Sequence, residues 1–110
     1  MFERPIGITG NLGRPCRIER MVSGNLSLIL LEAAQWEEFD AFASEFLQRV
    51  GGALVSRADS AVDRVWTVRI RGEDFWLAFD DWHSHYELSA RTDRGDTIVI
   101  SLAAEFGESR

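Results

Sequence analysis

The fold is decided by the stretch Phe75-Trp-Leu-Ala-Phe-Asp-Asp-Trp-His-Ser-His-Tyr-Glu-Leu88, whose side chains alternate as in half-buried β-strands. It holds two of the four tryptophans, the only tyrosine and both histidines of the chain. One strand is expected up to Asp80 and a second from Trp82 to Ala90. Read at a period of two from Asp81, a row of polar side chains shares one face: Asp81, His83, His85 and Glu87. This polar row is the candidate site of the sequence.

An antiparallel meander is expected to lead into this stretch. Arg64–Ile70 alternates between apolar and polar residues, and the turn Arg71-Gly72-Glu73 would join it to the next strand as a hairpin. Ala53–Arg57 is expected to be a short strand, followed by a turn at residues 58–61. Leu26–Leu31 is nearly continuously apolar, which indicates a strand covered on both faces. Its periodicity alone also allows a buried helical segment.

The period changes to that of a helix after Ala33. Apolar residues recur there at spacings of three and four: Trp36, Phe39, Ala43, Phe46, Leu47 and Val50. Glu37 and Glu38 would lie in the first turn and Arg49 in the last, as the helix dipole favours. Gly51-Gly52 can supply a left-handed stop. The pattern predicts an amphipathic helix from about Ala34 to Val50 that packs its apolar stripe on the sheet.

The residues after the turn at Arg91–Gly95 allow two interpretations. Asp96 could cap a final helix, and an apolar stripe at helical spacing follows it: Ile98, Val99, Leu102, Ala103 and Phe106. Thr97–Ile100 could equally be a last strand, because its residues are all β-branched. The caps and the stripe favour the helix.

These elements together predict an α+β fold in a single domain, residues 1–110. An amphipathic helix would pack on an antiparallel β-meander in two layers, with a short C-terminal helix as the favoured ending. A chain of 110 residues buries a sufficient core without a metal or a disulfide. Residues 26–106 are expected to form that core. Residues 1–25 are rich in Gly and Pro, so loops are expected there, apart from a strand near Arg17–Val22.

The charge of the chain favours a basic partner. The net charge of −6 disfavours nucleic acid and anionic membranes, because both bind positive surfaces. Residues 73–96 contain seven carboxylates against two arginines. Apolar runs such as Leu28–Leu31 are too short to span a membrane, and the N-terminus lacks the pattern of a signal peptide. We therefore expect a cytoplasmic protein with a basic protein partner, and a homodimer is compatible with this pattern.

The polar row has limited chemistry of its own. His83 and His85 would point the same way and could ligate a divalent ion with a carboxylate, but zinc needs three or four ligands. The chain has no further histidine, so we expect both imidazoles to be exposed and without metal or other cofactor. Asp80 and Asp81 would lie on opposite faces, one of them capping a bulge or turn, and Ser84 would point away from the histidines. These arrangements do not favour catalysis, and a non-enzymatic role is expected.

The layout of the chain resembles that of small uncharacterised acidic α+β proteins of bacteria. The resemblance spans about residues 26–106 and is carried by the order of the elements and by four segments: Gln35-Trp-Glu-Glu-Phe39, Asp63-Arg-Val-Trp66, Phe75-Trp-Leu-Ala-Phe79 and Tyr86-Glu-Leu88. Some similar proteins are encoded as immunity partners of secreted toxins. The resemblance implies no catalytic residues.

Two functions remain open from the sequence. The first is a protein-binding or inhibitory module of the immunity type that docks a basic surface, because aromatic anchors ringed by charge are common in interfaces. Its contact residues are expected in the aromatic and acidic stretch: Asp80, Asp81, Trp82, His83, His85 and Glu87. The alternative is a small-ligand or metal-binding domain that uses the face of His83 and His85.

Overall fold

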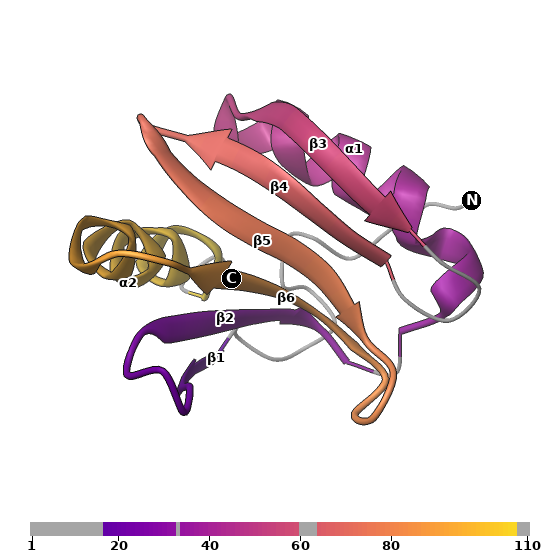
Figure 1. Ribbon diagram of the computed structural model, residues 1–110, viewed down its shortest axis with the longest axis horizontal. Coiled ribbons are helices and arrows are strands. Elements are labelled where there is room, and N and C mark those ends of the chain that lie inside the picture. Colours follow the sequence, from indigo (N-terminus) through magenta and orange to yellow (C-terminus); the bar gives the residue numbers. More distant parts are fainter. Residues whose placement is uncertain (1–16, 33, 60–63, 108–110) are drawn as a thin grey trace.

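The described residues form one antiparallel sheet with helices on one of its faces (Figure 1). The computed structural model describes residues 17–32, 34–59 and 64–107. Its elements follow in this order: β1 (Arg17–Arg20), β2 (Leu26–Leu31), the 3₁₀ helix η1 (Trp36–Glu38), α1 (Phe39–Val50), β3 (Ala53–Asp59), β4 (Arg64–Ile70), β5 (Glu73–Asp80), β6 (His85–Ala90) and α2 (Asp93–Gly107). The strands lie in the order β1-β2-β6-β5-β4-β3. The predicted α+β class is confirmed.

The core lies between the sheet and the helices α1 and α2. Alternate residues of the central strands are buried in it: Trp66, Val68, Ile70, Phe75, Leu77, Phe79, Tyr86, Leu88 and Ala90. The helices contribute Phe39, Phe42, Ala43, Phe46, Leu47, Val99 and Leu102. Phe46 of α1 lies 6.1 Å from Phe106 of α2 between ring centres, so the two helices share this layer. The alternation predicted for β4 and β5 is confirmed, whereas the predicted helical stripe omitted Phe42.

The predicted cover of β2 on both faces is confirmed. Leu28 and Ile29 are successive residues that point to opposite faces, and they are 0% and 3% exposed. Leu28 belongs to the core that the helices cover. The strand interpretation of this apolar run is therefore correct.

The predicted ends of β4 and α1 are also confirmed. Arg71 and Gly72 have φ angles of 55° and 85°, the two positive values that a two-residue type I′ hairpin needs. This turn sets the register in which Ile70 pairs with Glu73. Gly51 ends α1 in the left-handed conformation, with a φ angle of 69°.

The helix that precedes β3 begins later than predicted. Ala34 lies in a loop, where its N–H donates a hydrogen bond to the carbonyl of Ser84 at 2.8 Å. A 3₁₀ turn follows, and α1 starts only at Phe39. The apolar Trp36 extended the helical pattern in the sequence, but its ring is partly buried and packs against Arg64. The guanidinium carbon of Arg64 lies 3.9 Å from the ring centre.

The strand predicted from Trp82 to Ala90 also begins later. β6 starts at His85, and residues 81–84 form the turn that joins it to β5. Ser84 has a φ angle of 54°, which interrupts an extended strand. The prediction of a polar row along one strand is therefore wrong, because half of the row lies in the turn.

The C-terminal segment is a helix, as the caps and the stripe favoured, and the alternative last strand is wrong. Thr92 caps α2 by accepting a hydrogen bond from the N–H of Gly95 at 2.9 Å, in place of the predicted Asp96. The carboxylate of Asp96 instead accepts a hydrogen bond from the N–H of Leu26 at 2.9 Å, which ties α2 to β2. Neither α1 nor α2 has the length of a helix that could cross a membrane.

The strands β1 and β3 form the edges of the sheet. β1 is the strand expected near Arg17–Val22, although it ends at Arg20. The loops expected in residues 1–16 lie outside the described residues. β3 continues to Asp59, two residues beyond the prediction, and the turn expected at residues 58–61 falls partly outside the described residues.

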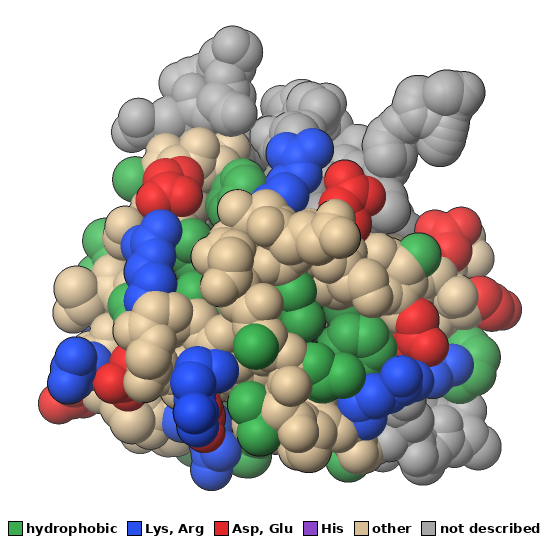
Figure 2. Space-filling view, turned by 90° about the horizontal axis from the view of Figure 1, so that it is seen from above, with side chains coloured by type: hydrophobic (Ala, Val, Ile, Leu, Met, Phe, Trp, Pro, Cys, Tyr) green, Lys and Arg blue, Asp and Glu red, His purple; other side chains and the backbone are tan. Residues whose placement is uncertain are grey.

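The edge strand β3 is irregular. Its pairing with β4 shifts by one residue between Leu54 and Ser56, so Val55 forms a β-bulge. Leu54 and Val55 are nearly half exposed. Figure 2 views the molecule from the side of β3 and α1, where basic and acidic side chains are interspersed with apolar ones. Arg57 of β3 pairs there with Asp40 of α1 at 3.3 Å.

The phenol of Tyr86 gives a spectroscopic prediction. Its ring is 1% exposed and lies 4.5 Å from that of Phe42, and its hydroxyl donates a hydrogen bond to the carbonyl of Gln35. Burial, assisted by the charge of Glu38, raises the pKa of Tyr86 far above its usual value of 10.0. The folded state therefore favours the neutral phenol. This stabilisation is complete below pH 10 and is lost progressively as the pH rises above it, because the unfolded chain then ionises first.

In an alkaline titration, we expect the ultraviolet absorbance of phenolate to appear only together with the loss of the folded circular-dichroism signal. The chain has a single tyrosine, so the absorbance reports this one group. A phenolate signal that appears near pH 10 while the fold persists would contradict the burial of Tyr86.

Truncation of Phe42 tests the core. Phe42→Ala should lower the free energy of unfolding by about 3–5 kcal/mol, because it leaves a cavity among residues that are fully buried. Trp36→Ala should cost less, because its side chain is only partly buried. Urea denaturation measures both, with Glu45→Ala as a surface control. A smaller loss for Phe42→Ala than for Trp36→Ala would show that the core is wrongly assigned.

Candidate functional site

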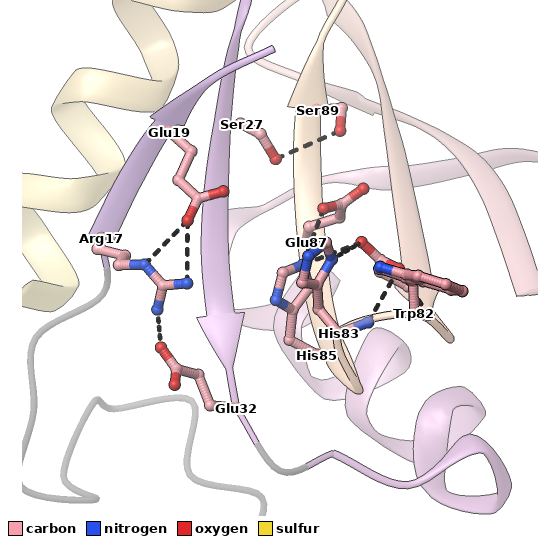
Figure 3. Close-up of polar contacts among 10 residues, drawn as sticks. Arg17, Glu19, Ser27, Glu32, Trp82, His83, His85, Glu87 and Ser89 are labelled. Atoms are coloured by element: carbon pink, nitrogen blue, oxygen red, sulfur yellow. Dashed lines mark hydrogen bonds and ion pairs between the residues drawn. The ribbon is translucent and has the colours of Figure 1, made fainter.

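The turn between β5 and β6 gathers the residues that the sequence singled out. We call this set the hairpin tip: Asp80, Asp81, Trp82, His83, His85 and Glu87. Asp80 ends β5 and pairs with His85, the first residue of β6. Because Tyr86 faces the core, His85 and Glu87 point to the sheet face away from the helices. Figure 3 shows His83, His85 and Glu87 turned toward one another.

The side chain of Asp80 builds the turn. Its Oδ1 accepts hydrogen bonds from the backbone N–H of Trp82 at 2.9 Å and of His83 at 3.3 Å. This is an Asx turn, in which a carboxylate oxygen replaces a backbone carbonyl. Its Oδ2 lies 2.9 Å from His83 Nδ1 and 3.5 Å from His85 Nε2. One carboxylate therefore fixes both the backbone of the turn and the ring of His83.

The contact with Asp80 changes the protonation of both partners. The hydrogen bond that His83 donates to the carboxylate of Asp80 raises the pKa of His83, and the charge of Glu19 on β1 adds to this effect. Partial burial opposes the ionisation of Asp80, but the hydrogen bonds from His83 and Trp82, with the charge of His85, outweigh it and lower the pKa of Asp80. The geometry thus favours a charged pair of imidazolium and carboxylate.

The two histidines differ in exposure, so the expectation that both are exposed is wrong. The side chain of His83 is 61% exposed, whereas that of His85 is 5% exposed. Their rings are stacked, with centres 5.3 Å apart and planes 11° apart. Nε2 of His85 also lies 3.0 Å from Oε1 of Glu87. His85 is therefore a buried imidazole held between the carboxylates of Asp80 and Glu87.

The sequence analysis joined the wrong aspartate to the histidines. Asp81, which belonged to the predicted polar row, is exposed in the turn. Asp80, which was expected on the opposite face, contacts both rings. The expectation that one of the two aspartates caps a turn is confirmed for Asp80. An aspartate that forms such a turn accepts hydrogen bonds from the backbone N–H groups two and three residues later. Had this been applied to Asp80, the strand would have been predicted to end at the correct residue.

The carboxylates of residues 73–96 do not form one acidic surface. β5 places Glu73 and Asp74 about 20 Å from Asp80, at the other end of the strand. Asp74 pairs there with Arg69 at 2.8 Å. Three of the seven carboxylates gather at the hairpin tip, so a partner would meet less charge than the sequence suggests.

An ion-pair chain that links β1 to the residue after β2 lies on the same sheet face as the hairpin tip (Figure 3). Arg17 bridges Glu19, at 2.9 Å, and Glu32. Ser27 of β2 and Ser89 of β6 lie 3.4 Å apart through their hydroxyl oxygens. These contacts continue the polar face of the sheet toward the β1 edge.

The hairpin tip offers ligand atoms to a metal ion. Asp80, His83 and His85 each supply one, and these three atoms lie within 4.8 Å of one another. Imidazole nitrogens combined with a carboxylate oxygen suit zinc and related transition metals rather than calcium or magnesium. The carboxylate that the sequence analysis placed beside the two histidines is therefore that of Asp80, not that of Asp81.

Comparison with known proteins adds a family. Residues 16–106 match the model of a family described as "Protein of unknown function (DUF3630)". This range begins next to β1, ends within α2 and includes the whole hairpin tip. No curated protein and no solved structure matches the chain.

Asp80→Asn separates the charge of Asp80 from its role in the turn. The amide keeps an oxygen that can accept the backbone hydrogen bonds, but it removes the charge beside His83. We expect the pKa of His83 to fall toward its usual value of 6.5, followed by NMR of the ring protons. The raised pKa of His83 stabilises the fold below the pKa of the unfolded chain, and this stabilisation is lost as the pH rises through the folded pKa. That pH dependence should disappear in the variant.

Asp81→Asn is the matched control, because it removes the charge next to Asp80 in the sequence, which does not belong to the group of Asp80, His83 and His85. It should leave the titration of His83 close to that of the unaltered protein. An unchanged pKa of His83 in Asp80→Asn would show that the contact between these side chains does not govern the titration.

Proposed function

The chain belongs to the DUF3630 family, and we propose that it is a non-enzymatic binding module whose hairpin tip docks a basic protein partner. The observation that carries the proposal is Trp82, which is 88% exposed at the end of a hydrogen-bonded turn. The six residues expected to contact a partner are those of the hairpin tip.

Trp82 has the properties of an interface anchor. Its large apolar ring gains free energy when a partner removes it from water. The backbone N–H of Trp82 already donates a hydrogen bond to Asp80, which orders this segment before a partner binds. The entropic cost of binding is therefore small. Tryptophan is also enriched among the residues that dominate interface energies. These features support a docking role for the turn.

The charge around Trp82 supports a basic partner. Asp81 is exposed beside it, and the side chains of Asp80 and Glu87 are 25% and 24% exposed. The net charge of −6 would attract a positive surface and raise the association rate. The same charge repels phosphate groups, which supports a protein rather than nucleic acid or an anionic membrane.

A basic secreted toxin is the partner class that the proposal favours. The resemblance to small acidic bacterial proteins, some of them immunity partners, supports an inhibitory role in the cytoplasm. Immunity by this route requires only a complementary surface, which agrees with a module without catalytic residues. The alternative function, metal binding on the face of His83 and His85, is supported by their cluster with Asp80.

The test uses the full chain, immobilised and exposed to a lysate of the organism that encodes it. Cross-linking and mass spectrometry should identify a basic protein bound at the hairpin tip. Trp82→Ala should weaken its affinity at least about tenfold, as expected for an interface anchor. Trp76→Ala is the matched control, because Trp76 is also exposed, at 45%, but lies on β5 beneath Arg91.

A second variant tests the role of charge in this binding. Asp81→Arg should slow the association with the captured protein and flatten the dependence of its rate on salt. Equal affinities of the Trp82→Ala and Trp76→Ala variants, or cross-links that avoid the hairpin tip, would refute the proposal.

A further inference from the structure

We infer that the hairpin tip is a binding site for a divalent transition-metal ion, with zinc as the best-fitting ion. The ligands are Asp80, His83 and His85, whose ligand atoms lie within 4.8 Å of one another, and Glu87, whose Oε1 lies 3.0 Å from His85 Nε2, would supply the fourth donor after a rotation of its side chain. This site does not depend on a protein partner, because its donors come from one hairpin.

The donor distances are close to those of a coordination shell. Zinc bonds of about 2.0–2.1 Å in a tetrahedron place neighbouring ligand atoms about 3.3 Å apart. Oδ2 of Asp80 and Nε2 of His85 are already 3.5 Å apart. Oδ2 of Asp80 and Nδ1 of His83 are 2.9 Å apart and would need to separate by only a few tenths of an ångström. The pairing of the two strands thus brings the donors together before any ion binds.

Nε2 of His85 has two carboxylate oxygens near it but can donate a hydrogen bond to only one of them. Oε1 of Glu87 lies 3.0 Å from it and Oδ2 of Asp80 lies 3.5 Å from it. A ring nitrogen carries at most one hydrogen, so it donates a good hydrogen bond to only one of two carboxylates. A cation at the centre of the three atoms would interact favourably with all of them. The side chain of His85 is 5% exposed, so this imidazole is shielded from water.

The ring of His83 has to turn to complete the site. An imidazole binds a metal in its own plane, and the two stacked rings lie in nearly parallel planes, 11° apart. The side chain of His83 is 61% exposed, so it can rotate without disturbing the core. His85 and Asp80 provide the fixed part of the site, and His83 and Glu87 close it.

The donor chemistry selects the class of ion. Two imidazole nitrogens and two carboxylate oxygens suit zinc, which favours four ligands in a tetrahedron. Calcium and magnesium prefer shells of oxygen ligands alone. Binding would displace the hydrogen between His83 and Asp80, so metal uptake should release protons.

The experiment uses the full chain, produced without a histidine tag and treated with a chelator that is then removed. Isothermal titration with zinc should show one equivalent bound per chain, and magnesium should show none. Zinc should raise the melting temperature in a concentration-dependent way, because it binds the folded state. Cobalt in place of zinc should give the visible absorption of a tetrahedral site.

The variants assign the ligands. His83→Ala should weaken zinc binding at least about tenfold, and its side chain is exposed enough that the fold should persist. Asp80→Asn should weaken it similarly while keeping an acceptor for the turn. Asp74→Asn, which alters a partly exposed carboxylate at the other end of β5, is the control that should keep the affinity.

The outcome is decided by comparison of these variants. Weaker binding in His83→Ala and Asp80→Asn, with unaltered binding in Asp74→Asn, supports the site. Absence of zinc binding to the folded chain, or equal affinity in all variants, overturns it. Neither result depends on Trp82, so the metal site and the docking role can fail separately.

Discussion

Strand alternation is the constraint on which both the core and the hairpin tip depend. Phe79 and Tyr86 pair across β5 and β6, and both must face the helices because their rings are buried. The next pair, Asp80 and His85, is therefore forced onto the other face, where the two side chains lie opposite each other. Slippage of this pairing by one residue would bury a carboxylate and expose an aromatic ring, so the packing of the core also protects the polar cluster.

The sequence predicts the elements whose pattern and packing agree. Phe75, Leu77 and Phe79 alternate because one face of β5 is covered, and Gly51 marks a helix end because it tolerates a positive φ angle. The start of α1 was misplaced because Trp36 fits a helical spacing although its ring serves as a platform for Arg64. Such a contact between distant segments leaves no trace in local periodicity.

The sequence identified the residues of the candidate site but not their arrangement in space. Trp82 and Ser84 continue the alternation of the neighbouring strands, so the turn is hidden within a strand-like pattern. The hydrogen bonds that the carboxylate of Asp80 accepts from the backbone, together with the positive φ angle of Ser84, reverse the chain there. Similarly, the density of carboxylates along residues 73–96 overstates their density in space, because an extended strand separates Glu73 from Asp80. Carboxylates that are close in the sequence therefore come close together in space where the chain turns, and an extended strand keeps them apart.

The bulge at Val55 has a consequence for self-association. An open sheet exposes unpaired backbone groups at both edges, and a straight edge strand can template the addition of further strands, as in fibrils. In this chain one edge is kinked by the bulge in β3, and the other is the four-residue β1 with Arg17, Glu19 and Arg20 among its side chains. Both features hinder edge-to-edge polymerisation through the outermost strands of the described residues.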